Sequence, residues 1–163
     1  LSLFLLVLIS QINAYSQMQG RGIRVKDGDT YIVNVKNKPV TIRLNNVDAP
    51  EMNQAWGIKS AKNISNVILG KSVVYTVTGT DRYGRILANV EINGKALDEQ
   101  LVENGWAWVY NQYNSKPQLL TLQRDAINAQ KGLWYCGANK VCPPWLFRGY
   151  NKLNRAKYCR GCK

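Results

Sequence analysis

The chain has 163 residues, with 22 lysines and arginines against 10 aspartates and glutamates, four cysteines and no histidine. This length suits one domain with a hydrophobic core, and the formal net charge of +12 favours a polyanionic partner such as nucleic acid, an anionic membrane surface or an acidic polysaccharide. The lack of histidine excludes Ser-His-Asp and Cys-His catalysis and histidine-ligated zinc, so catalysis would depend on carboxylates, other polar side chains or a hard metal ion.

An almost wholly apolar run opens the chain, from Leu1 to Ile9. It is too short to span a bilayer but has the length of the apolar region of a signal peptide, and Ala14 offers a small residue for cleavage. We therefore expect residues 1–14 to be a signal peptide whose basic n-region is missing from the sequence. The alternative is a buried N-terminal strand or helix. We expect no stable membrane span after Ala14 and a secreted or periplasmic product.

Hydrophobic periodicity predicts strands over residues 21–26, 31–35 and 40–44, a helix over 57–69, strands over 71–78 and 85–92, and helices over 97–104 and 117–131. In the third strand, period two places Arg43 on the face opposite Ile42 and Leu44. Three strands, a helix, two strands and two helices favour an α+β fold that is mainly β: a five-stranded OB-fold barrel with three helices. Such a barrel offers a binding surface but does not specify an activity.

Carboxylates gather at the expected turns of this basic chain: Asp27 and Asp29 flank Gly28, and Asp48 lies three residues before Glu51. A hard cation takes oxygen ligands from such groups. Each motif also has a structural alternative, because Asp-x-Asp forms Asx turns and an aspartate followed three residues later by glutamate can cap a helix.

Two arginines accompany these carboxylates. Arg43 lies five residues before Asp48, and Arg85 ends the segment Asp81-Arg-Tyr-Gly-Arg85. Phosphodiester cleavage uses a cation, a carboxylate that activates water and guanidiniums that bind the phosphate oxygens. For each arginine alone, a structural salt bridge is the alternative.

All four cysteines lie in the last 28 residues, at positions 136, 142, 159 and 162. In an exported protein they predict disulfides, paired either locally (Cys136–Cys142 and Cys159–Cys162) or across the two pairs. A four-cysteine zinc site is the competing interpretation. The segment beyond Asp125 has no acidic residue and interleaves cations with aromatic side chains, which suits either nucleic-acid binding or a solvated tail over the barrel.

Five motifs together resemble the staphylococcal nuclease (thermonuclease) family, in order and at suitable spacing. They are Asp27-Gly-Asp-Thr30, Arg43-Leu-Asn-Asn-Val-Asp-Ala-Pro-Glu51, Asp81-Arg-Tyr-Gly-Arg85, Leu101-Val-Glu-Asn-Gly-Trp-Ala107 and Lys131-Gly-Leu-Trp134. The resemblance covers residues 21–148 and leaves residues 149–163 as a basic, cysteine-containing tail.

The resemblance implies a calcium-dependent, sugar-nonspecific nuclease that hydrolyses DNA and RNA to 3′-phosphate products; magnesium or manganese is a less favoured cofactor. It also implies a role for each site residue. Asp29, Asp48 and the carbonyl of Ala49 would bind calcium, and Asp27 would support these metal ligands from outside. Glu51 would act as general base, and Arg43 and Arg85 would bind the phosphate. Tyr83 would donate a hydrogen bond to the phosphate, and Tyr110 or Tyr113 would stack on a base. Ala49 replaces a threonine of the family, and the loop of residues 52–57 is shortened, which affects substrate access.

Three classes of function therefore stay open. The leading one is the exported nuclease, which we expect to be a monomer. The runner-up is a noncatalytic nucleic-acid-binding OB-fold module, although the chain keeps every acidic residue and arginine of the family's site. The third is a cationic surface protein that binds acidic glycans or anionic lipid.

Overall fold

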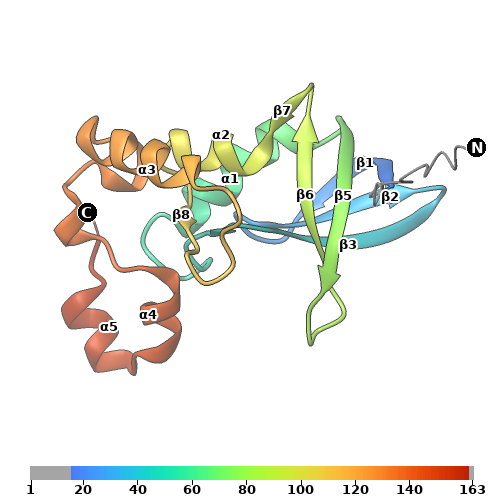
Figure 1. Ribbon diagram of the computed structural model, residues 1–163. Helices are drawn as coiled ribbons and strands as arrows, with labels where there is room; N and C mark the ends of the chain where they lie inside the picture. Colours follow the sequence, from blue (N-terminus) through green and yellow to red (C-terminus); the bar gives the residue numbers. More distant parts are fainter. Residues whose placement is uncertain (1–15, 162–163) are drawn as a thin grey trace, which may run out of the picture.

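Figure 1 shows the computed structural model, which describes residues 16–161. The predicted signal peptide over residues 1–14 lies outside the described residues, as does Cys162. Within residues 16–161, no helix combines the length and the hydropathy needed to cross a membrane.

Five strands form the predicted barrel: β1 (Gln17–Val25), β2 (Thr30–Val35), β3 (Lys38–Leu44), β5 (Ser72–Thr80) and β6 (Ile86–Ile92). They lie in the order β3-β2-β1-β5-β6, and a parallel pairing between β3 and β6 closes the barrel. The expected alternation is confirmed, because Ile42 and Leu44 are buried whereas Arg43 points to the opposite side and lies at the barrel end.

Three short strands lie outside this alternating pattern. β4 (Val47–Asp48) pairs with β8 (Trp108–Val109), and β7 (Lys95–Ala96) continues the sheet beyond β6. Strands of two residues carry no periodicity, so the sequence does not predict them.

Three helices pack on the barrel as predicted: α1 (Gly57–Ile68), α2 (Leu97–Glu103) and α3 (Gln118–Asn128). Their buried residues, such as Ile64, Leu101 and Leu119, belong to the same core cluster as the strands. α3 ends three residues before the predicted end at Lys131. The reason is that Gln130 adopts a left-handed conformation with φ of 50° and Lys131 N–H donates back to the carbonyl of Ala126, which closes the helix early.

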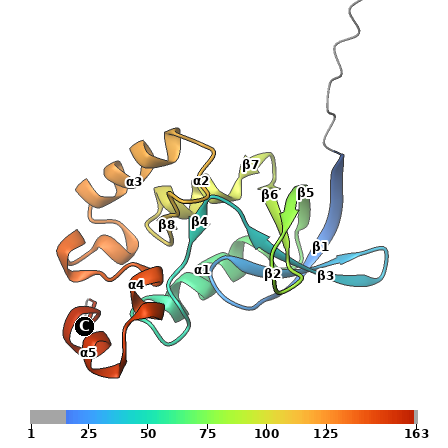
Figure 2. The ribbon, with the colours of Figure 1, turned by 60° about the horizontal axis from the view of Figure 1, so that its bottom comes forward.

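The C-terminal segment is folded, which the sequence analysis did not predict. It contains the 3₁₀ turns η1 (Gly132–Trp134) and η2 (Ala138–Lys140), followed by α4 (Pro144–Gly149) and α5 (Lys152–Tyr158). The predicted boundary between core and tail, after Arg148, falls inside α4. Figure 2 shows α4 beside the segment that joins β4 to α1.

A disulfide joins Cys142 to Cys159 across α4 and α5. This bond excludes the local pairing of Cys136 with Cys142 and a zinc site made by all four cysteines, and none of the described cysteines is free. Cys142, Phe147 and Cys159 form a small buried cluster of their own, separate from the barrel core.

Candidate active site

The strand register brings three predicted site residues to one end of the barrel. Asp29 directly precedes β2, and the first residue of β2, Thr30, lies opposite Arg43 on β3. On its other side Arg43 lies opposite Leu87 of β6, two residues after Arg85. Residues 29, 43 and 85 are far apart along the chain, and the barrel makes them neighbours.

The short pairing of β4 with β8 places Asp48 beneath Arg43. Asp48 lies opposite Trp108 in this pairing, and Tyr110 follows two residues later, where its N–H donates to the carbonyl of Asn46. The predicted metal ligand Asp48 and the predicted stacking residue Tyr110 therefore border the same space.

The turn after β4 positions Glu51. Its N–H donates to the side chain of Gln54 at 3.1 Å, and Gln54 N–H donates back to the Glu51 carbonyl at 2.8 Å. Gly57 packs so closely on that carbonyl that a Cβ would collide with it. No helix begins within residues 48–51, so the alternative that Asp48 and Glu51 cap a helix is wrong.

A cleft of about 680 Å³ opens at this end of the barrel. Its lining includes every residue that the sequence analysis singled out: Asp27, Asp29, Arg43, Asp48, Ala49, Glu51, Tyr83, Arg85, Tyr110 and Tyr113. The structure therefore brings the whole predicted set together. The individual chemical roles stay predictions.

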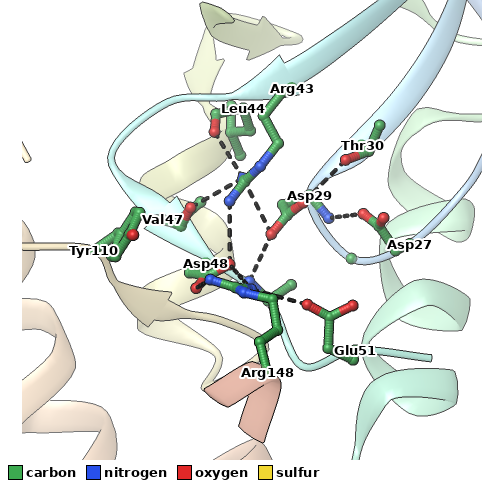
Figure 3. A network of polar contacts seen from close by, with 12 residues as sticks. Asp27, Asp29, Thr30, Arg43, Leu44, Val47, Asp48, Glu51, Tyr110 and Arg148 are labelled. Atoms are coloured by element: carbon green, nitrogen blue, oxygen red, sulfur yellow. Dashed lines mark hydrogen bonds and ion pairs between the residues drawn. The ribbon is translucent and has the colours of Figure 1, made fainter. Parts of the chain in front are cut away.

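Arg43 is the centre of the polar network in Figure 3. Its guanidinium lies 3.1 Å from a carboxylate oxygen of Asp29 and 3.1 Å from one of Asp48, and it donates to the carbonyls of Leu44 and Val47 at 2.9 and 3.0 Å. Burial lowers the pKa of Arg43, but Asp29 and Asp48 outweigh burial and raise it. Arg43 thus stays charged and rigidly placed, so the salt-bridge interpretation holds alongside any role in phosphate binding.

The acidic side of the cleft carries closely spaced negative charge. Asp27 accepts a hydrogen bond from the N–H of Asp29 at 3.1 Å, as expected for an Asx turn. Burial and the neighbouring Asp29 raise the pKa of Asp27 to about 7. Burial and Asp29 also raise the pKa of Asp48, against the opposing effect of Arg148 and Arg43. Burial, together with repulsion between the carboxylates, therefore disfavours their full ionisation.

Arg85 reaches the cleft from the loop before β6. Its Nε donates to Asp81 at 2.6 Å, and its Nη1 donates to the hydroxyl of Thr30 at 3.3 Å. The other Asp81 oxygen accepts the N–H groups of Tyr83 and Arg85. Burial raises the pKa of Asp81, but these hydrogen bonds outweigh burial and lower it. Asp81 thus fixes the direction of Arg85.

Three tyrosines line the rim. Tyr83 is 69% exposed at the tip of its loop, with the guanidinium of Arg85 5.6 Å from the ring. The ring centroids of Tyr110 and Tyr113 lie 5.1 Å apart. Tyr110 also stacks on Trp145 of α4, with a distance of 5.6 Å between ring centroids and an angle of 21° between the ring planes. One face of Tyr110 is thus occupied by protein, while Tyr113 is 56% exposed.

Arg148 is a fourth guanidinium-bearing residue of the cleft, after Arg43, Arg82 and Arg85. From α4 it donates to both carboxylate oxygens of Asp48, at 3.2 and 2.8 Å, and to Glu51 at 2.8 Å. The hydrogen bonds with Asp48 are the main reason that its pKa is raised. The helix α4, which spans the predicted boundary between core and tail, therefore supplies part of the cleft.

Residues 41–136 match the family model described as staphylococcal nuclease homologue, which is more than half of the chain. The chain belongs to this family. It is 43% identical over 134 residues to an uncharacterized endonuclease of Escherichia coli, covering 82% of this chain and 86% of that protein. It is 36% identical to an uncharacterized endonuclease of Haemophilus influenzae, and the alignment covers 93% of this chain and 86% of that protein. It is 30% identical to a micrococcal nuclease of Shigella flexneri, with 90% of this chain and 89% of that protein covered.

The donor atoms fit the hard cation that membership of the staphylococcal nuclease family implies. The described part of the chain has no cluster of three or more acidic, cysteine or histidine side chains arranged for a metal ion. The expected set is smaller, with two carboxylates (Asp29 and Asp48) and one backbone carbonyl (Ala49). All three supply oxygen, which a hard divalent cation prefers. Such an ion would offset the burial and the repulsion from Asp29 that raise the pKa of Asp48.

Sequence analysis missed Arg148 and Trp145 as residues of this region. Both lie outside the five motifs that carry the resemblance and beyond residues 41–136, which match the family model, and no spacing connects them with residues 48–51. One signal was available. Because no acidic residue follows Asp125, any arginine of the tail that forms an intramolecular ion pair must find its carboxylate earlier in the chain.

Proposed function

We propose that this protein is an exported, calcium-dependent nuclease that hydrolyses phosphodiester bonds of DNA and RNA and leaves 3′-phosphates. The observation that carries the proposal is the convergence of the acidic set and two arginines, separated by up to 58 residues along the chain, in one cleft of a staphylococcal nuclease family member. The net charge of +12 supports a polyanionic substrate.

Each protein group has a distinct task in this proposal. Glu51 takes a proton from the attacking water, which adds to phosphorus as hydroxide. The bond from phosphorus to the 5′ oxygen breaks, and that oxygen leaves with the bonding electrons and takes up a proton from solvent water to become a hydroxyl. Arg43 and Arg85 bind the phosphate oxygens and bind them more tightly as negative charge develops during attack.

The rigid environment of the two arginines supports this role. Arg43 is held by Asp29, Asp48 and two carbonyls, and Arg85 is held by Asp81, so neither needs to reorganise before the reaction. Asp29, Asp48 and the Ala49 carbonyl would hold the calcium ion, which supplies positive charge to a phosphate oxygen. Tyr83, Tyr110 and Tyr113 would contact the sugar–phosphate chain and bases at the rim.

One cleavage experiment tests the reaction. Purified protein is incubated with single- and double-stranded DNA and RNA in calcium, magnesium, manganese or EDTA, and the products are tested for a 3′-phosphate with a 3′-phosphatase. We expect cleavage of all four substrates in calcium, none in EDTA, recovery when calcium is added back, and fragments that are extended by a polymerase only after the phosphatase.

The same experiment separates the competing functions. Tight, salt-sensitive binding without cleavage in any metal would favour the noncatalytic binding module. Binding of heparin or anionic vesicles at least as strong as binding of DNA would favour the cationic surface protein. Cleavage that persists in EDTA would contradict the metal-dependent mechanism.

Export is a separate part of the proposal. The apolar run before Ala14 suggests it, and the Cys142–Cys159 disulfide supports it, because such bonds persist mainly in oxidising compartments. Fusion of residues 1–14, placed behind a start methionine and a basic segment, to a reporter that is active only outside the cytoplasm tests this part. An inactive reporter would contradict export.

A further inference from the structure

The guanidinium of Arg148 donates hydrogen bonds to carboxylate oxygens that, in the proposed reaction, bind the metal ion or accept a proton. It takes both oxygens of Asp48, a predicted metal ligand, and Oε1 of Glu51, the predicted base. Figure 3 shows it reaching up from α4 between these two carboxylates, opposite Arg43. Asp48 is thus held by one guanidinium on each side, from β3 and from α4.

A divalent ion and Arg148 would compete for these oxygens. Asp48 has two carboxylate oxygens, and the fork of Arg148 engages both, as guanidinium–carboxylate geometry allows. A second cation at the same oxygens would be strongly repelled, because like charges at contact distance in a partly buried site are weakly screened. Binding of a divalent ion therefore weakens the hold of Arg148 on Asp48 and Glu51.

The backbone that carries Arg148 is anchored independently of this ion pair. The disulfide holds α4 to the end of α5, and Gln54 of the Glu51 turn donates to the carbonyl of Cys142 at 2.5 Å. Trp145, one turn before Arg148, packs between Tyr110 and Trp108 with ring centroids 5.6 and 5.7 Å away. The helix therefore keeps the guanidinium close to the cleft whether or not the ion pair is made.

The side chain itself has freedom that the helix lacks. Arg148 is 45% exposed, against 12% for Arg43, and its guanidinium hydrogen bonds are all to Asp48 and Glu51. It can turn into the open cleft without disturbing the core. Arg43 cannot, because it also holds two backbone carbonyls.

We infer that Arg148 is a tethered counter-cation that occupies the calcium-binding oxygens of the resting protein and must be displaced for a divalent ion to bind. The inference rests on the proposed calcium site and adds a control on it: α4 sets the calcium concentration at which the site fills. Binding of calcium then releases Glu51 from its ion pair, so the base becomes available when the metal is in place.

Calcium binding, measured by titration calorimetry without nucleic acid, tests the inference. Arg148→Ala should bind calcium at least about tenfold more tightly than the wild type, because calcium no longer has to break charge-assisted hydrogen bonds to Asp48. Arg148→Lys should fall between the two, since an ammonium cannot engage both oxygens. Arg82→Ala is the matched control. It removes one positive charge from the same cleft but makes no contact with Asp48 or Glu51, and it should change the affinity by less than about threefold.

A second measurement guards against a trivial effect of the substitution on folding. In wild type labelled with ¹⁵N, the Nε–Hε signal of Arg148, assigned by its loss in Arg148→Ala, should shift when calcium is added. Equal calcium affinity of wild type and Arg148→Ala, or equal tightening in Arg82→Ala, would overturn the inference. If cleavage in calcium is intact in that case, the proposed function survives. If no variant binds a divalent ion and none cleaves, the calcium site and the inference fail together.

Discussion

Single residues in this cleft have a structural role as well as the chemical role that we propose. Arg43 neutralises Asp29 and Asp48 and ties down two carbonyls of the turn between β3 and β4. Removing one partner of such a buried pair typically costs about 3–5 kcal/mol, since the other charge is left uncompensated. Loss of activity in Arg43→Ala would therefore not by itself prove a catalytic role, and substitutions that keep the hydrogen bonds are more informative.

Glu51→Gln is such a substitution. The amide keeps an acceptor for Arg148 but cannot take a proton from water, so turnover in saturating calcium should fall by about 10²–10³-fold. Initial rates on single-stranded DNA measure it. Glu103→Gln, an exposed change at the end of α2, is the control and should keep the wild-type rate. Full activity of Glu51→Gln would remove the general-base mechanism.

Asp27 predicts a pH dependence of stability. Its pKa is about 7 in the folded chain because of burial and Asp29, against about 3.8 when unfolded, so the folded state binds more protons between these values. Stability in EDTA should therefore fall as pH rises from 4 to 7 through this group.

Asp27→Asn should remove that loss, because the amide keeps the acceptor for the Asp29 N–H without the charge. We expect the variant to be more stable than the wild type by about 1 kcal/mol or more at pH 8 and equal to it near pH 4. Urea unfolding at the two pH values measures the difference. Asp125→Asn, at an exposed aspartate, should show no such pattern, and a constant offset at both pH values would contradict the assignment.

At the scale of elements, the cleft has two walls of different origin. The barrel wall comes from β2, β3 and the loop before β6, whose residues share the main core cluster. The opposite wall comes from α4, which belongs to a separate small cluster with α5. The two walls meet through Gln54, Trp145 and Arg148. We therefore expect that α4 and α5 can loosen without loss of the barrel.

Replacing both Cys142 and Cys159 by serine tests this independence. The bond closes a separation of 17 residues, for which loop-closure entropy gives about 3 kcal/mol. Amides of α5 should lose most of their hydrogen-exchange protection, while those of β2 and β5 in the same sample stay protected. Loss of protection throughout the barrel would show that the disulfide supports the whole fold.

The whole molecule combines a strong positive charge with a cleft whose own charges are nearly matched. The excess of cations lies largely outside the network of Figure 3, and no acidic residue follows Asp125. In the proposed function, long-range attraction of a polyanion and local chemistry at the phosphate would thus be supplied by different residues. Affinity should depend on the first and turnover on the second.

Binding of single-stranded DNA in EDTA, where cleavage is not expected, should weaken steeply with salt. The logarithm of the affinity should fall linearly with the logarithm of the sodium chloride concentration, with a slope of about −0.7 per neutralised phosphate. Fluorescence anisotropy at several salt concentrations measures the slope, and Glu51→Gln should leave it unchanged. An affinity that is insensitive to salt would contradict the charge argument.

The sequence by itself determined the barrel and the list of candidate site residues. Alternating apolar residues specify which side of each strand is buried, and contiguous motifs such as Asp48-Ala-Pro-Glu51 can be matched to a family without coordinates. Only the tertiary structure decided how these motifs meet. The parallel pairing of β3 with β6 and the position of α4 beside Asp48 bring together residues that are far apart along the chain. Arg148 lies 100 residues from Asp48, and its contact depends on a disulfide, an aromatic stack and a helix of six residues. These features have no periodic pattern in the sequence, because the helix is short and the partner of each long-range contact is decided by packing.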